Sequence, residues 1–228
     1  MGRVLGLDVS TKTIGIALFE EDGRLLELTH VTPKIKPKPD TPLELLMRKA
    51  QSFEEEFLQK YSDFDIDKVF IEEPLLGSNN VNTVGVLLRF NGMICRSVYD
   101  VLNVVPTFIS SYDARKYAFP ELMVKRTHKR DGEPLTEGAI DRNKEVLFGG
   151  LPFDIDKKMV IWEKVSDIEP QIVWLYDKNM KLKKENFDMT DSYAVVLGGM
   201  HKKVCGFLQQ QSKILFFLKN YHYIWIYV

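Results

Sequence analysis

Residues 5–17 read LGLDVSTKTIGIA, and this stretch decides the fold. An apolar run ends on Asp8, a short polar turn follows, and a second run rich in Ile and other aliphatic residues comes next. Glu21-Asp22-Gly23 then gives a hairpin signal before a third strand pattern. We therefore predict three antiparallel strands joined by tight turns, at residues 3–9, 13–19 and 24–31. This meander would place Asp8 at the end of its first strand.

Helix and strand patterns alternate along the rest of the chain. Prolines among lysines make residues 33–42 an extended connector, and Thr41 can cap a helix that begins at Pro42. The expected helices cover residues 42–57, 80–102, 111–117, 140–148 and 190–200, and the further expected strands cover 67–72 and 104–109. Residues 120–138 are polar and are expected to form a mobile loop. A strand, a crossover helix and a strand favour parallel additions to the meander, so the fold class is α/β.

The composition is that of a globular protein. The 228 residues are 45% hydrophobic and 28% charged with a net charge of −1, which excludes a disordered or fibrous chain. Two cysteines cannot build a disulfide framework, and no apolar run is long enough to cross a bilayer. We therefore expect a soluble, intracellular protein. Residues 1–75 carry 10 basic and 15 acidic side chains and residues 76–228 carry 21 and 17, so a polyanion should bind mainly to the second part.

Carboxylates at the ends of predicted elements could form a metal site. Asp8 ends the first strand, and Glu72 and Glu73 end the fourth. Asp188 and Asp191 lie three residues apart near the start of the last helix, so they share a face. Each alone has an ordinary explanation as a turn residue, a solvated strand end or a helix N-terminal charge. Together they would repel one another without a cation, and they offer the oxygen ligands that Mg²⁺ prefers.

Further motifs accompany the opening stretch. They are FIEEP at residues 70–74 with Asn79, YDAR at 112–115, NKEV at 143–146 and DMTDSYA at 188–194. In combination, over residues 3–149 and 186–201, the chain resembles the RuvC-type Holliday junction resolvases of the ribonuclease H-like superfamily. The Ser-Thr form of its first motif is more similar to phage and viral relatives than to bacterial housekeeping ones.

The resemblance implies a fold, an activity and a set of site residues. The fold would be a five-stranded mixed sheet flanked by helices, in a homodimer with residues 80–102 at its contact. The activity would be metal-dependent hydrolysis of DNA strands at a four-way junction by paired symmetric nicks, in recombination, repair or replication and packaging. Two Mg²⁺ ions, or Mn²⁺, would be held in each active site by Asp8, Glu72, Asp188 and Asp191. Lys144 would offset transition-state charge, or else it is an ordinary solvated lysine.

The same resemblance divides the chain into parts. A ribonuclease H-like nuclease domain would cover residues 1–203, with an insertion at about residues 150–185 that is longer than the family's usual connection. Residues 204–228, dense in aromatic side chains, would form a C-terminal extension of unknown role.

The predicted contacts to nucleic acid follow from charge and from the motifs. They are Lys12, Leu75, Ser78, Asn79, Arg115, Lys116, Lys125, Arg126, Lys129 and Arg130. Leu75 stands where the family has an aromatic residue that can stack on bases at the junction centre. A leucine side chain can insert between bases but cannot stack on them as well. The basic run within residues 125–130 would contact phosphates, with a solvated loop as the alternative. Ser78 and Asn79 would bind the backbone near the cut or cap the following helix.

Other classes of protein remain open. A nuclease of the same fold could act on other branched DNA or on RNA. An actin-like or sugar-kinase-like ATPase also opens with a strand, an aspartate and a hairpin, but it should carry a second glycine-rich phosphate motif, for which Gly149-Gly150 is a weak substitute. A non-catalytic DNA-binding scaffold is disfavoured because all four ligand positions are acidic. Zinc chemistry is not expected, since the histidines and cysteines lack ligand spacing. An organic cofactor and a membrane partner are not expected either.

Overall fold

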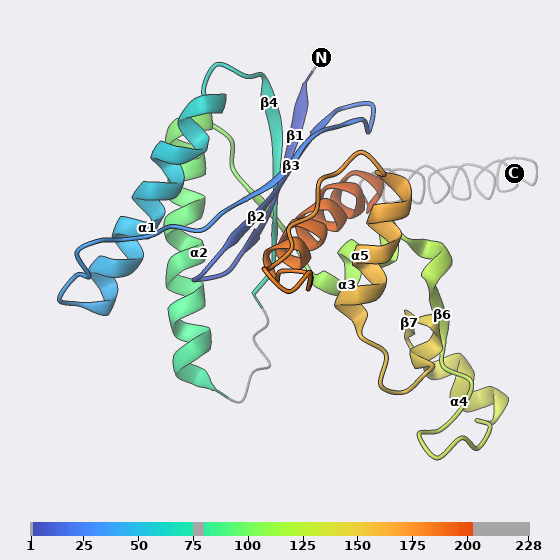
Figure 1. Cartoon of the computed structure of the whole chain (residues 1–228). Coiled ribbons are helices and arrows are strands. Elements are labelled where there is room, and N and C mark those ends of the chain that lie inside the picture. Colours follow the sequence, from blue (N-terminus) through green and yellow to red (C-terminus); the bar gives the residue numbers. More distant parts are fainter. Residues whose placement is uncertain (1, 75–79, 203–228) are drawn as a thin grey trace, which may run out of the picture.

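The computed structural model describes residues 2–74 and 80–202. A five-stranded sheet in the order β3-β2-β1-β4-β5 forms the centre of the protein (Figure 1). The strands are β1 (Arg3–Val9), β2 (Ile14–Glu20), β3 (Leu25–Val31), β4 (Ile66–Glu72) and β5 (Thr107–Ile109). The first three pair antiparallel, and β4 and β5 add in parallel on the other side of β1. The predicted mixed five-stranded α/β sheet is therefore confirmed.

Local hydrogen bonds explain the two tight turns of the meander. At the β1–β2 turn, the Ser10 hydroxyl donates to the Thr13 carbonyl at 2.8 Å and accepts from the Thr13 amide at 3.0 Å. At the β2–β3 turn, Asp22 accepts from the Arg24 amide at 3.0 Å, and Gly23 has a φ of +93° that favours glycine. Both turns are built from adjacent residues, which is why the sequence alone predicted them.

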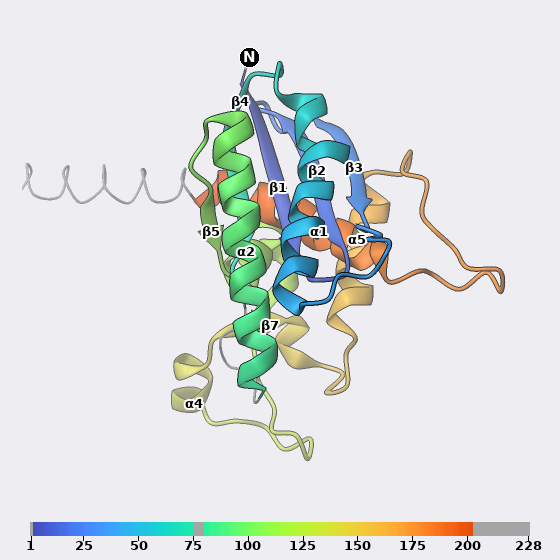
Figure 2. The same cartoon turned by 90° about the vertical axis from the view of Figure 1, so that its left-hand side faces the viewer.

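Helices α1 (Pro42–Glu56) and α2 (Val81–Leu102) pack side by side on one face of the sheet (Figure 2). Thr41 accepts a hydrogen bond from the Glu44 amide, as predicted, and Asn80 caps α2 by accepting from the Thr83 amide. A short 3₁₀ helix, η1 (Leu58–Tyr61), follows α1. Buried side chains from both helices and from β1, among them Phe53 and Phe90, make one continuous core.

The other face of the sheet carries α3 (Ser111–Ala118), α5 (Lys157–Ile168) and a helix over residues 185–202 (Figure 1). Ser110, rather than the predicted Ser111, caps α3 by accepting from the Asp113 amide. The last helix lies directly against β1 and β2: a Cβ atom at Gly15 would collide with the backbone carbonyl of Asp188. Glycine in the opening stretch therefore permits this close approach, which positions the last helix over the end of β1.

Residues 119–150 depart most from the sequence prediction. They contain η2 (Pro120–Leu122), β6 (Met123–Lys125), α4 (Glu137–Arg142), β7 (Glu145–Leu147) and η3 (Phe148–Gly150). β6 and β7 pair antiparallel, so residues 120–138 are not simply a loop. Of the helix predicted over residues 140–148, only residues 140–142 are helical, in α4, and residues 145–147 form a strand. Three-residue strands show no clear period of their own, and they form here because their partner lies about twenty residues away in the sequence. We call residues 119–150 the arm.

Residues 150–185 pack on the body of the protein. Ile161 and Val165 of α5 are fully buried in the same core as Phe19 and Tyr193. This core contains side chains of β2, α5 and the last helix, so the long insertion belongs to the layer that covers the sheet. Among the described helices, none is long and apolar enough to span a membrane.

Candidate active site

Carboxylates from three elements meet at one end of the sheet. Asp8 is the sixth residue of β1 and Glu72 is the last of β4. These strands are parallel neighbours with Leu7 paired to Ile71, so Asp8 and Glu72 lie side by side. One oxygen from each of Asp8, Glu72 and Asp191 lies within 4.8 Å of the other two. The structure therefore brings together three of the four predicted ligands from positions far apart in the sequence.

Asp188, the fourth predicted ligand, lies one helical turn before Asp191 on the same helix. Its carboxylate and that of Asp191 share an ion-pair partner, Lys158. The charge of Asp188 also raises the pKa of Asp8 and of Glu72, so it belongs to the same electrostatic group. We call Asp8, Glu72, Asp188 and Asp191 the acidic cluster.

Burial and the charges of neighbouring carboxylates raise the pKa of three members of the acidic cluster, Asp8, Glu72 and Asp188. Burial, followed by the charges of Glu72, Asp191 and Asp188, raises the pKa of Asp8 well above its usual value. Burial and Asp191 raise the pKa of Glu72 to about 7. For Asp188, burial is again the main cause, and its pKa rises to about 6. Clustered carboxylates with this resistance to ionisation are stabilised when a cation is present to compensate their charge.

Two basic side chains touch the acidic cluster. Arg115, on α3, donates to Asp191 at 3.2 Å, and both side chains are largely buried. The ammonium of Lys158, on α5, lies 3.5 Å from Asp191 and 3.9 Å from Asp188. Burial alone would lower the pKa of Lys158, but the charges of the acidic cluster outweigh it and raise that pKa. Arg115 was predicted as a nucleic-acid contact, and here it holds a carboxylate in place.

Sequence reasoning missed Lys158. It lies in the segment 150–185, to which no motif gave a role, and it is a lysine among many in the chain. The usable signal was local: Asp156 begins α5 by accepting from the amides of Lys158 and Met159. That cap fixes where the helix starts, but the contact with the acidic cluster depends on how α5 packs against the last helix.

Lys144 lies between α4 and β7 and not within a helix. Its ammonium is 5.8 Å from the centre of the Tyr112 ring, and that of Lys116 is 5.9 Å from the same ring. Lys116 also forms an ion pair with Glu145 at 2.9 Å. The predicted roles of Lys144 and Lys116 toward nucleic acid stay predictions, because their contacts here are with the protein itself.

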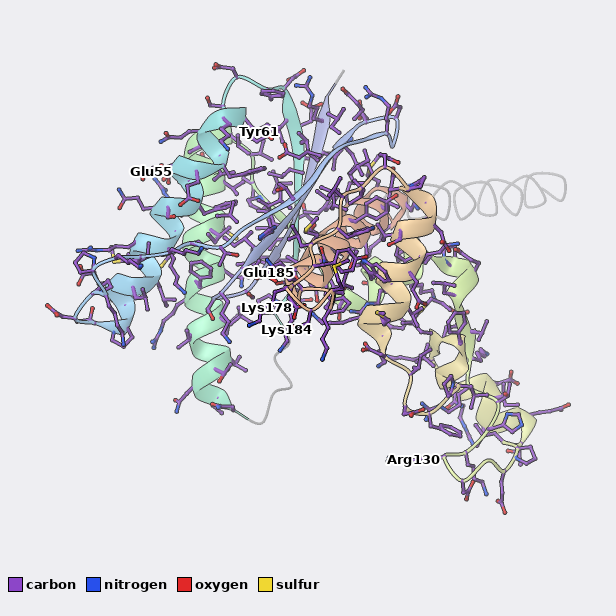
Figure 3. All side chains as sticks on the ribbon, in the orientation of Figure 1. Glu55, Tyr61, Arg130, Lys178, Lys184 and Glu185 are labelled. Atoms are coloured by element: carbon purple, nitrogen blue, oxygen red, sulfur yellow. The ribbon has the colours of Figure 1, made fainter. Side chains whose placement is uncertain are left out.

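The basic run of residues 125–130 lies on the arm. Lys125 pairs with Asp141 at 3.7 Å, Lys129 pairs with Glu133 at 2.7 Å, and the Arg126 guanidinium lies over the ring of Phe153. Arg130 sits at the tip of the arm, away from Glu185 at the start of the last helix (Figure 3). The arm and the first half of α2 both extend beyond the end of the sheet that bears the acidic cluster (Figures 1 and 2). The predicted contacts Leu75, Ser78 and Asn79 lie outside the described residues.

The donor set fits a hard divalent cation. All four members of the acidic cluster offer carboxylate oxygens, and the oxygens of three of them are close enough together to share an ion. Oxygen ligands suit Mg²⁺ and Mn²⁺ rather than the softer metals. Compensation by Arg115 and Lys158 is incomplete, since among the described residues these two cations face four carboxylates. Burial is the main cause of the raised pKa values of Asp8, Glu72 and Asp188, and the neighbouring carboxylates add to it.

Comparison with solved structures identifies the architecture. No protein-family model matches this sequence, and no curated protein matches it. A solved structure of Thermus thermophilus RuvC in complex with a Holliday junction substrate is similar, with a TM-score of 0.52 and 10% identity over 90% of this chain and 96% of that chain. A second structure of Thermus thermophilus RuvC has a TM-score of 0.50 and 15% identity over 89% and 96%. The yeast mitochondrial Holliday junction resolvase Ydc2 aligns with a TM-score of 0.44 and 13% identity over 92% and 84%. The chain therefore has the ribonuclease H-like fold of RuvC.

Proposed function

We propose that this protein is a metal-dependent, structure-selective DNA endonuclease that resolves four-way junctions by paired symmetric nicks. The observation that carries the proposal is the meeting of Asp8, Glu72 and Asp191 within 4.8 Å on a RuvC-like fold. The resemblance of the five motifs to RuvC-type resolvases supports the same assignment, and the Ser-Thr form of the first motif is more similar to phage and viral relatives. The enzyme would act wherever its DNA is recombined, repaired or replicated, with residues 1–203 as the nuclease domain and residues 204–228 as an extension.

Asp8, Glu72, Asp188 and Asp191 would hold Mg²⁺ or Mn²⁺, two ions in each active site. When bound, these ions supply Lewis-acid stabilisation for hydrolysis of a phosphodiester. Asp8 lies centrally in the group because β1 is flanked by β2 and β4. From the middle strand, Asp8 would be the central residue of the set that holds the ions.

The basic residues around the acidic cluster have separate tasks. Arg115 donates to one carboxylate oxygen of Asp191 and Lys158 pairs with the other, so these two cations hold the Asp191 carboxylate beside Asp8 and Glu72. Lys158 has an exposed side chain beside the cluster, from which it can reach a phosphate oxygen and stabilise charge that develops there. Lys144 is the residue to which the resemblance gives this task, whereas Lys158 is the lysine in ionic contact with the carboxylates.

A homodimer would supply the two active sites that paired nicks require. The helix expected at its contact, α2, exposes nearly half of the Leu88 side chain, and Phe108 on the edge strand β5 is equally exposed. A largely apolar cavity of about 430 Å³ lies between them, with Gly92 and Cys95 also in its wall. Apolar surface of this kind supports burial against a second copy.

The test is incubation with an end-labelled four-way junction, in Mg²⁺ and separately in chelator, with the nicks mapped on all strands. The proposal expects nicks at symmetric positions on two opposing strands, in Mg²⁺ alone. Three-way junctions, flaps, linear duplexes and structured RNA serve as parallel substrates. Preferential cutting of any of these would replace the junction as the substrate, and no cutting of any of them in Mg²⁺ or Mn²⁺ would contradict the nuclease assignment.

A further inference from the structure

A cleft lined by lysines adjoins the acidic cluster. Its volume is about 770 Å³, which is within the range of small-ligand sites. Its charged lining residues are Lys12, Lys49, Lys158, Lys184, Glu185 and Asp188. The four lysines come from four separate parts of the chain, namely the β1–β2 turn, α1, α5 and the segment before the last helix. Figure 3 shows Lys184 and Glu185 at the start of that helix. We call this cavity the lysine cleft.

Three of these lysines have no carboxylate partner among residues 2–74 and 80–202. Within the described part of the chain, no acidic oxygen lies within ion-pair distance of the ammonium groups of Lys12, Lys49 or Lys184. Lys49 is half-buried and donates to the Thr11 carbonyl at 2.5 Å. Burial, together with the charge of Lys12, lowers the pKa of Lys49. An ammonium in this position is stabilised when an anion enters the cleft.

The lysine cleft is continuous with the acidic cluster. Asp188 belongs to both, and Lys158, which also lines the cleft, lies in ionic contact with it. The β1–β2 turn, which supplies Lys12, begins two residues after Asp8 and is held rigid by the two hydrogen bonds of Ser10. A strand whose phosphate lay on the carboxylates would therefore have its neighbouring nucleotides beside these lysines.

We propose that the lysine cleft binds the sugar-phosphate backbone of the nucleic-acid strand next to the phosphate that is cut. This inference rests on the proposed nuclease function and adds to it a binding subsite made by Lys49 and Lys184. Lysines and the hydroxyls of Ser10, Thr13 and Thr32 line the cleft, and these groups bind phosphates without reading bases. The subsite holds the cut strand by its charge, in any sequence.

The experiment measures binding separately from cleavage. The Asp8→Asn protein, in chelator, is titrated with a short single-stranded oligonucleotide at several salt concentrations. Each lost phosphate contact on a single strand reduces the slope of log affinity against log salt by about 0.7. Lys49→Gln combined with Lys184→Gln should therefore flatten the slope by about 1.4, and Lys49→Arg with Lys184→Arg should keep it. Lys60→Gln is the matched control, since Lys60 is an exposed lysine of η1 that does not line the cleft.

Each outcome decides the inference. A slope unchanged by the double glutamine variant, with its melting temperature intact, overturns the subsite. The subsite is also overturned if inorganic pyrophosphate displaces the oligonucleotide when both are present at the same concentration of phosphate groups. The cleft would then be a general anion site. If the wild-type protein cuts no nucleic acid, the proposed nuclease function fails, while the salt slope still reports on the cleft. If it cuts and the slope is unchanged, the cleft alone fails.

Discussion

Two basic regions of the molecule differ in how their charges are arranged. On the arm, Lys125 to Arg130 are adjacent in the sequence, and Lys125 and Lys129 are neutralised by Asp141 and Glu133. In the lysine cleft, the charges come from residues 12 to 184, three of the four have no acidic partner among the described residues, and the cleft touches the acidic cluster. A basic run in a sequence is therefore a weaker indication of a binding site than unpaired lysines brought together by the fold.

The largest expected effect is the loss of cleavage when the acidic cluster, which adjoins the lysine cleft, is changed. Asp8→Asn removes the central carboxylate of the acidic cluster, so cleavage should fall by at least about 10²- to 10³-fold, the size typical of a lost electrostatic group in an active site. Binding of junction DNA should remain, because the lysines are untouched. Junction nicking and binding, measured side by side, test this. Retained cleavage would remove Asp8 from the mechanism. The position of the lysine cleft beside the acidic cluster would then no longer favour it over the arm as the binding site for the cut strand.

The arm is tested next by replacing Lys125, Arg126, Lys129 and Arg130 together with alanine. If all four contact phosphates of duplex arms, the salt slope should flatten by about 3.6. Because two of them are ion-paired within the arm, we expect a smaller change, of about 2. Binding of a four-way junction at several salt concentrations gives the slope. An unchanged slope would exclude phosphate contact by the arm and leave the cleft as the basic site.

Lys158 and Lys144 provide a smaller comparison between the same two regions. Lys158→Gln should lower the rate of cleavage about tenfold, equivalent to ~1.4 kcal/mol, because it removes the exposed cation that contacts Asp188 and Asp191. Lys144→Gln, which removes a charge on the arm beside Tyr112, should have less effect. Single-turnover cleavage at saturating protein separates the rate from binding. A larger loss of cleavage rate in Lys144→Gln than in Lys158→Gln would support the role that the resemblance predicts for Lys144, which is to offset transition-state charge.

The smallest effect is on stability. The pKa values of Asp8, Glu72 and Asp188 are higher in the folded protein than in the unfolded chain, so the folded state binds more protons. Without metal, the contribution of these groups to the free energy of unfolding should be greatest below about pH 4. It should fall as the pH rises through the pKa of Asp188, about 6, and that of Glu72, about 7. Glu72→Gln should reduce this fall, and Mg²⁺ should raise the melting temperature at pH 8 by about 2–4 °C per kcal/mol of binding. Thermal unfolding at pH 5 and pH 8, with chelator and with Mg²⁺, measures both. A melting temperature that rises with pH in chelator would contradict the repulsion inferred for the acidic cluster.

The candidate site was predictable where its signal was local. Asp8, Glu72, Asp188 and Asp191 each end a strand or lie on a helix face with a clear pattern, and the structure gathers them. The arm was predicted wrongly, as a loop and a helix, because β6 and β7 are three residues long and each depends on the other for its hydrogen bonds. Lys158, Lys49 and Lys184 carried no signal, because nothing near them in the sequence distinguishes them from other lysines.

The sequence by itself determined the meander, its turns and the strand-end carboxylates, because hydrogen bonds and hydrophobic periods act between neighbouring residues. Gly15 leaves room for the backbone of Asp188, but only the tertiary structure brings the last helix into that room. Only the tertiary structure decided which cations face those carboxylates. Ion pairs and clefts are formed by side chains that meet through packing, and Lys158 is 150 residues from Asp8 in the chain while its charge acts directly on that carboxylate in the fold.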